Sequence, residues 1–139
     1  MTEDELLTTL VEAEHAAIYG YGVLGARLDD VTRRAAVLAY DGHRARRDTV
    51  VSALAARGLV APTPLPAYDV VVTARPDALA LAVRLEEGLG QRWRDLVGGT
   101  DTRSLRQLGL AGLTETAVRA AQWRRLLGVV PPTVALPGS

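Results

Sequence analysis

The chain has 139 residues and no cysteine, which fits a single domain and excludes disulfides, thiolate metal sites and cysteine nucleophiles. Its sixteen basic residues, all arginine, balance sixteen acidic residues, so the chain lacks the net basic charge of a nucleic-acid-binding protein. The N-terminal segment has no signal-peptide pattern, and no segment is apolar enough to span a membrane. We therefore expect a cytoplasmic protein that binds neither nucleic acid nor membranes.

Helix-forming residues dominate the sequence, and apolar side chains recur at steps of three and four, which predicts an all-α protein. The first helix is expected over residues 2–28, and the acidic residue Glu14 falls on its apolar stripe. A second helix is expected over residues 30–57, from an aspartate N-cap to a glycine stop. The link between them is short, so these two helices are expected to be antiparallel neighbours.

Residues 58–76 contain four prolines and no helical period. About nineteen extended residues reach about 60 Å, more than the roughly 39 Å of a 26-residue helix, so this segment is long enough to run the length of a bundle. The third and fourth helices are expected over residues 77–97 and 101–127, with a kink near the glycines of the fourth as an alternative. The tail, residues 128–139, is expected to be extended because its prolines forbid a helix.

A single long crossover between helices two and three is the connection of a ferritin-like antiparallel four-helix bundle. An up-down bundle with a flexible middle loop is the alternative. Ferritin-like di-metal sites take a Glu from each of two helices and a Glu-x-x-His pair from each of the other two. Here Glu14, His43 and Glu86 point inward, but Tyr40 stands where the glutamate before His43 should be. The fourth helix has no histidine, and its one carboxylate, Glu115, lies beside the apolar stripe, so a di-iron centre is not expected.

Buried carboxylates need a positive partner, and arginines near the inner faces can supply the charge that a metal would otherwise supply. The sequence therefore predicts a buried polar network of Glu14, Tyr40, His43, Arg47, Glu86 and Arg119. Two alternatives stay open. One is an atypical iron, manganese or zinc site on Glu14, His43 and Glu86, and the other is a surface pair that would follow from a different helix register.

Other candidate residues favour structural roles. His15 is about 100° from Glu14 around the helix, so an exposed or interface position is expected for it. Trp93 and Trp123 are expected to be core anchors whose N–H groups find partners. The glycines of YGYGVLG match the spacing of a phosphate-binding loop, but they lie inside a helix, so they predict close helix packing. No nucleophile elbow is present, and no catalytic residue is assigned.

The segments EHAAIYGYGVLGARL, AYDGHRARRD, LEE…W, AAQWRR and a closing LPG are similar to those of a ferritin-like domain family of unknown function found mainly in actinobacteria. The resemblance covers about Leu6 to Gly138. It implies a ferritin-like bundle that self-associates, with no established activity. The motif positions that it carries over, none with an assigned role, are Glu14, His15, Tyr19, Tyr21, His43, Arg44, Arg47 and Trp123.

These observations predict a non-enzymatic binding or structural module that has lost its di-iron site and forms a homodimer. No cofactor is expected. The alternative is a metalloprotein with a divalent ion on the atypical site defined above. The class of any small ligand is left open by the sequence.

Overall fold

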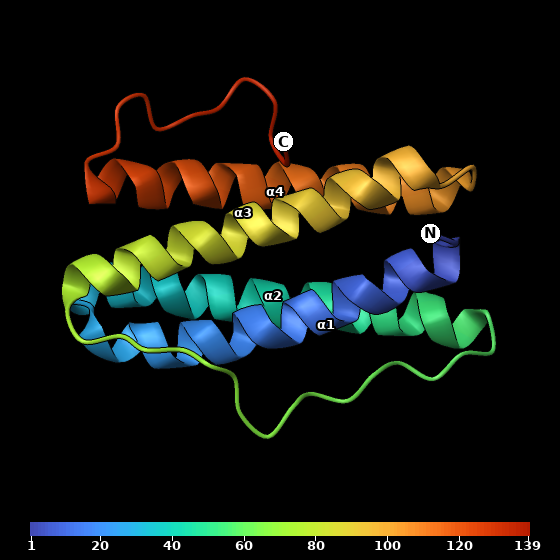
Figure 1. Cartoon of the computed structure of the whole chain (residues 1–139), viewed down its shortest axis with the longest axis horizontal. Helices are drawn as coiled ribbons and strands as arrows, with labels where there is room; N and C mark the ends of the chain where they lie inside the picture. Colours follow the sequence, from blue (N-terminus) through green and yellow to red (C-terminus); the bar gives the residue numbers. More distant parts are fainter.

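A computed structural model of residues 1–139 contains four α-helices and no strand, arranged as a four-helix bundle (Figure 1). The elements are α1 (Glu3–Leu24), a short 3-10 helix η1 (Gly25–Arg27), α2 (Asp30–Ala56), α3 (Arg75–Gly99) and α4 (Arg103–Leu127). A long crossover joins α2 to α3, whereas the other links are short. The prediction of an all-α four-helix bundle, with its long connection between the second and third helices, is therefore confirmed.

Side-chain caps begin the first two helices, and the aspartate cap of the second is the one that the sequence predicts. Thr2 caps α1 in a capping box, in which its backbone N–H donates to Glu5 Oε2 at 2.7 Å. Asp29 caps α2 by accepting from the backbone N–H of Thr32 at 2.9 Å. Gly128 ends α4 with a φ of 86°, a left-handed conformation that glycine adopts without the steric cost of a Cβ.

The glycines near the ends and middle of the last two helices do not interrupt them. Helix α3 continues through Gly98 and Gly99, and α4 is one unbroken helix through Gly109 and Gly112. A Cβ added to Gly112 would lie 2.3 Å from Cδ2 of Trp93. These α4 glycines therefore let α4 approach α3 closely, and they do not divide α4 into two helices.

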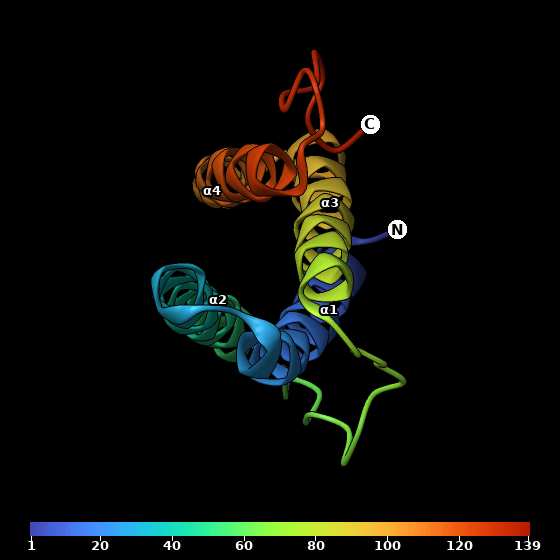
Figure 2. The same ribbon diagram turned by 90° about the vertical axis from the view of Figure 1, so that its left-hand side faces the viewer.

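Helix α3 packs most extensively on α4, and α1 packs to a similar extent on α2 and on α3. Figure 2 shows α2 and α4 well separated on the remaining side of the bundle. The crossover runs back along α1 to the other end of the molecule (Figure 1). None of the helices combines the length and the apolar character that a membrane span needs.

His15 lies under the crossover and is only 7% exposed, so of the exposed or interface position expected for it, the exposed one is wrong. Its Nε2 donates to the backbone carbonyl oxygen of Pro62 at 3.0 Å. The ring of Tyr19 packs against that of Tyr68, with centroids 5.2 Å apart. Both α1 residues therefore attach the crossover to the bundle, and the helix face that carries them is covered by it.

The apolar core consists of two clusters, one toward each end of the bundle. One contains Leu7, Leu10, Val50, Leu54, Trp93 and Leu96, among others. The other contains Leu24, Leu28, Ala36, Leu79, Ala82 and Trp123, among others. On α2 and α3, His43 and Glu86 fall between the two clusters, and on α1 Glu14 lies three residues before Ala17, the last α1 residue of the first cluster. The fold thus places a polar layer at the middle of an apolar bundle.

Candidate functional site

The polar layer is centred on His43, whose two ring nitrogens each meet a carboxylate. Nδ1 lies 2.7 Å from Oε2 of Glu14, and Nε2 lies 2.8 Å from Oε1 of Glu86. The exposed fractions of Glu14, His43 and Glu86 are 0%, 0% and 1%. The inward stripes of α1, α2 and α3 therefore bring these three residues together as a buried triad.

Two aromatic side chains extend the triad to α4. The hydroxyl of Tyr21 donates to Oε1 of Glu86 at 2.5 Å, and the indole Nε1 of Trp123 donates to the Tyr21 oxygen at 2.9 Å. The Tyr21 ring also stacks on the His43 imidazole, with ring centroids 5.4 Å apart. The sequence places Tyr21 and Trp123 on inner stripes but does not reveal that they share a hydrogen-bond chain. Their spacing on α1 and α4 signals only burial.

Both carboxylates accept hydrogen bonds from the same ring, so the arrangement suits a doubly protonated imidazole. Burial alone disfavours the charged ring, but the hydrogen bonds and negative charges of Glu14 and Glu86 outweigh it and raise the pKa of His43 to about 9. Burial also raises the pKa of Glu14, against the lowering effect of His43. An imidazolium between two carboxylates leaves one excess negative charge in the triad.

Each carboxylate of the triad keeps one oxygen that accepts no hydrogen bond. These atoms are Oε1 of Glu14 and Oε2 of Glu86, and both are buried. Two buried donors, Nη1 of Arg119 and Nε1 of Trp93, are also without a partner, so the partner expected for the Trp93 N–H group is not found. Arg119 packs against α2, because a Cβ added to Gly42 would lie 2.2 Å from its Nη2. Its positive charge acts to lower the pKa of Glu14, although it donates no hydrogen bond to either glutamate.

The other residues expected in the network lie outside the triad. Arg47 pairs with Asp48, with Nη2 3.0 Å from the carboxylate, and does not reach the core. Tyr40 is partly buried beside the second apolar cluster, and the guanidinium of Arg44 lies 5.7 Å from its ring centre. Arg47 and Tyr40 lie near the inner face of α2. Long side chains at such positions can turn toward solvent, and the periodicity of the sequence does not show which way they turn.

Glu115 is bound by Arg46, an arginine that the sequence analysis does not identify as its partner. Nε of Arg46 donates to Oε2 of Glu115 at 2.9 Å, and Nη2 pairs with Oε1. This pair connects α2 and α4 across the side of the bundle where these two helices are well separated. The hydrogen bonds from Arg46 lower the pKa of Glu115. Arg46 follows His43 by three residues, so both lie on the same side of α2. This spacing is the only feature of the sequence that indicates a position for Arg46 near the polar layer.

The residues present do not fit a di-metal centre. Helix α4 brings Thr116, Ala120 and Trp123 to the core and no ligand, while Glu115 is bound by Arg46. His43 lies between the two glutamates with its nitrogens directed to opposite sides, so the three side chains do not surround a common point. No group of three or more His, Cys, Asp or Glu side chains is arranged to hold a metal ion.

Comparison with known proteins agrees with this architecture and adds no activity. The family described as a domain of unknown function (DUF4439) matches residues 7–139. The crystal structure of a conserved hypothetical protein from Mycobacterium tuberculosis is similar at 36% identity with a TM-score of 0.86. The match covers 89% of this chain and 96% of the other. No curated protein matches the chain.

Proposed function

Because the chain belongs to the family described as a domain of unknown function (DUF4439), we propose a function from the contacts in the core of the protein itself. The protein is a non-enzymatic, ferritin-like binding or structural module that has lost the di-iron site. The observation that carries this proposal is the occupation of both His43 nitrogens by Glu14 and Glu86. The imidazolium supplies a positive charge between the two buried carboxylates, so His43 takes the place that an ion between them would occupy.

The ferritin-like relationship is supported by the single long crossover between α2 and α3. An actinobacterial origin is supported by the similarity to the Mycobacterium tuberculosis protein. Homodimer formation and a cytoplasmic location stay predictions.

A second candidate function is a metalloprotein with an atypical iron, manganese or zinc site on Glu14, His43 and Glu86. It is favoured by the free oxygens on the two glutamates, Oε1 of Glu14 and Oε2 of Glu86. To bind an ion, His43 would have to release one of its carboxylates, because each of its nitrogens is already engaged.

Metal analysis combined with thermal unfolding separates the two functions. Protein purified without added metal is expected to contain only substoichiometric iron, manganese and zinc, and its melting temperature is expected to be unchanged by EDTA or by any of these ions. Glu14→Gln is the test variant, and Glu12→Gln, an exposed position on the same helix, is the matched control. Stoichiometric metal that is lost in Glu14→Gln but kept in Glu12→Gln would instead establish the metalloprotein.

A further inference from the structure

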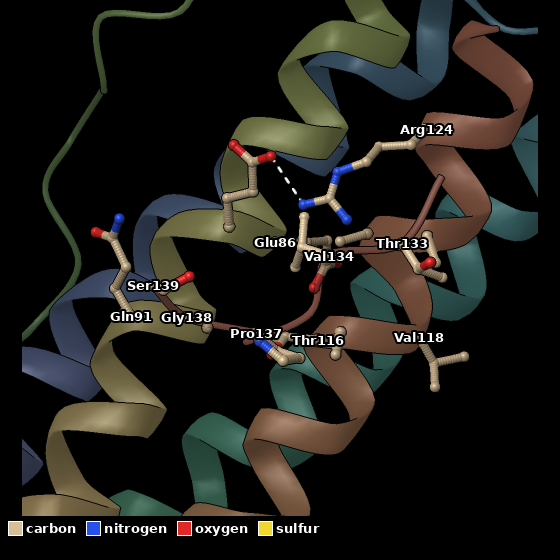
Figure 3. Close-up of a pocket in the computed structure, with 15 residues that line it drawn as sticks. Glu86, Gln91, Thr116, Val118, Arg124, Thr133, Val134, Pro137, Gly138 and Ser139 are labelled. Carbon is tan, nitrogen blue, oxygen red and sulfur yellow. Dashed lines mark hydrogen bonds and ion pairs between the residues drawn. The ribbon is translucent and has the colours of Figure 1, made fainter. Parts of the chain in front are cut away.

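Two segments without regular structure cover outer faces of α1, α3 and α4. The crossover lies along α1, and the C-terminal tail folds back over α3 and α4 (Figure 1, Figure 2). Figure 3 shows Thr133, Val134 and Gly138 of the tail beside these two helices, with which they line a cavity of about 400 Å³. Nη1 of Arg124 attaches the tail by donating to the Pro132 carbonyl oxygen at 3.2 Å. Neither segment covers the open side of the bundle, between α2 and α4.

Beside this open side, α2 exposes large apolar side chains to solvent. Val31 and Leu38 are 74% and 73% exposed, and Ala35 between them is exposed as well. Their spacing, four residues and then three, places the three side chains along one line of the helix. Single exposed apolar residues are common on protein surfaces, whereas aligned ones form a continuous patch. We call these three residues the outer stripe of α2.

A second, smaller cavity of about 170 Å³ adjoins the outer stripe. It is lined by Ala35, Leu38 and Ala39 of α2 and by Arg119, Gln122, Trp123 and Leu126 of α4. The cavity exists because α2 and α4 are well separated here (Figure 2). Its volume is below the roughly 300 Å³ at which small-molecule pockets usually begin. An aliphatic side chain inserted from another protein molecule therefore suits it better than a separate ligand.

Charged residues flank the outer stripe on the side away from α4. The side toward α4 is the one from which Arg46 bonds to Glu115. On the other side, Arg34 and Asp41 are both exposed and stand seven residues apart, which is about two helical turns. Within its own chain Asp41 pairs with Arg44 at 4.0 Å, and an exposed pair of this kind contributes little. One edge of the stripe therefore presents a positive and a negative charge at a fixed spacing.

This arrangement of charges is complementary to itself. When two α2 helices pair antiparallel, Leu38 of one copy can lie against Ala35 of the other. Because the helices run in opposite directions, Arg34 then lies beside Asp41 of the other copy, and the two-fold axis repeats this pair. Shifting the register by seven residues would place either the two Asp41 carboxylates or the two Arg34 guanidinium groups against each other. Like charges disfavour both shifted registers.

We propose that a second copy of this chain docks on the open side of the bundle, through antiparallel pairing of the two α2 helices about a two-fold axis. Leu38 of each copy enters the smaller cavity of the other, where it meets Leu126. Arg34 of each copy pairs with Asp41 of the other. The inference rests on the proposed function as a binding or structural module, and it names the partner and the surface.

The first test is the mass of the protein in solution, measured by analytical ultracentrifugation over a series of concentrations. The unaltered chain is expected to form a dimer of twice its mass of 14.8 kDa. Leu38→Glu is expected to raise the dissociation constant of the dimer about tenfold or more, because it places a charge in an apolar contact. Leu110→Glu, at an exposed leucine of α4 outside the proposed interface, is the matched control and is expected to leave the dimer unchanged.

Charge exchange tests the register of the two helices. Arg34→Asp and Asp41→Arg each bring like charges together twice, so each is expected to weaken the dimer about tenfold or more. The double variant that carries both changes restores unlike pairs and is expected to dimerise as the unaltered chain does. Circular dichroism confirms that every variant is folded, since all of these positions are exposed.

The proposal is overturned if the unaltered chain stays monomeric at the highest concentration measured, which would leave the open side to a lipid or to a different protein. It is also overturned if Leu38→Glu dimerises normally or if the double variant is as weak as the single ones. Metal content is measured on the same sample. A metal-free monomer removes the dimer but leaves the non-enzymatic function intact, whereas stoichiometric metal in a dimer removes that function and leaves the interface.

Discussion

At the scale of single residues, His43 makes the central charged contacts of the core. It lies at the contact of three helices and receives a carboxylate at each nitrogen. Removing either glutamate would leave one buried N–H group of the imidazolium without an acceptor, which is more costly than losing an exposed ion pair. The triad is therefore expected to influence both stability and its dependence on pH.

We predict that the free energy of unfolding falls as the pH rises from about 6.5 to about 9. Below pH 6.5, His43 is protonated in both the folded and the unfolded chain, and its stabilising contribution is fully present. Between these values only the folded form keeps the proton, so the contribution is lost as the pH rises through the folded pKa of about 9. The difference amounts to at most about 3 kcal/mol. Urea unfolding at a series of pH values measures it.

The control for this prediction is His15→Gln, which leaves the triad intact and is expected to keep the pH dependence. His43→Gln is expected to flatten it. If that variant does not fold, the ¹⁵N signals of the His43 ring in the unaltered protein provide the answer at pH 7.5. A ring with only one protonated nitrogen would contradict the assignment of an imidazolium.

At the scale of elements, glycines determine how closely α4 packs on α3. Gly109 and Gly112 face this contact, and the fully buried indole of Trp93 lies where a Cβ of Gly112 would stand. A buried ring in a packed core has little room to move. The glycines therefore contribute through packing, despite their low intrinsic helix propensity.

We expect Gly112→Ala to destabilise the protein by about 1–3 kcal/mol, because the added methyl group overlaps Trp93. Gly88→Ala is the matched control on α3, where an added Cβ meets nothing within 4 Å. That change is expected to stabilise the protein by up to about 1 kcal/mol through helix propensity. Chemical denaturation compares the two variants, and equal stabilities would show that the α3–α4 contact can relax.

At the scale of the whole molecule, the crossover is the longest connection and is attached to α1. His15 bonds to Pro62, and Tyr19 packs against Tyr68. Val70 and Val72 pack against the second apolar cluster. A segment attached at several points should be protected from proteases even though it has no regular structure.

We predict that His15→Ala makes the crossover more sensitive to chymotrypsin, with cleavage after Leu59 and Tyr68. Loss of the hydrogen bond to Pro62 is expected to lower global stability by only about 1 kcal/mol, so local opening accounts for the faster cleavage. Glu12→Ala, exposed on the same helix, is the control. Mass spectrometry of the fragments identifies the sites, and an unchanged cleavage rate would mean that other contacts hold the segment.

Much of this architecture can be predicted from the sequence. Apolar periodicity predicts all four helices, and the prolines of residues 58–76 predict the crossover. The same periodicity places Glu14, His43 and Glu86 on inward faces, where the structure brings them together. The partnership of Arg46 with Glu115 could not be predicted in this way, because it depends on the distance between α2 and α4 across the open side of the bundle.

The sequence by itself determined which residues of each helix face inward, since the helical repeat is a local property of the backbone. Tertiary structure alone decided how the polar side chains pair. His43 is 29 residues from Glu14 and 43 from Glu86, so their contact depends on helix packing and on rotamers, neither of which the repeat specifies. The cavity between α3, α4 and the C-terminal tail also depends on tertiary structure, because the tail that forms one of its walls folds back over these two helices.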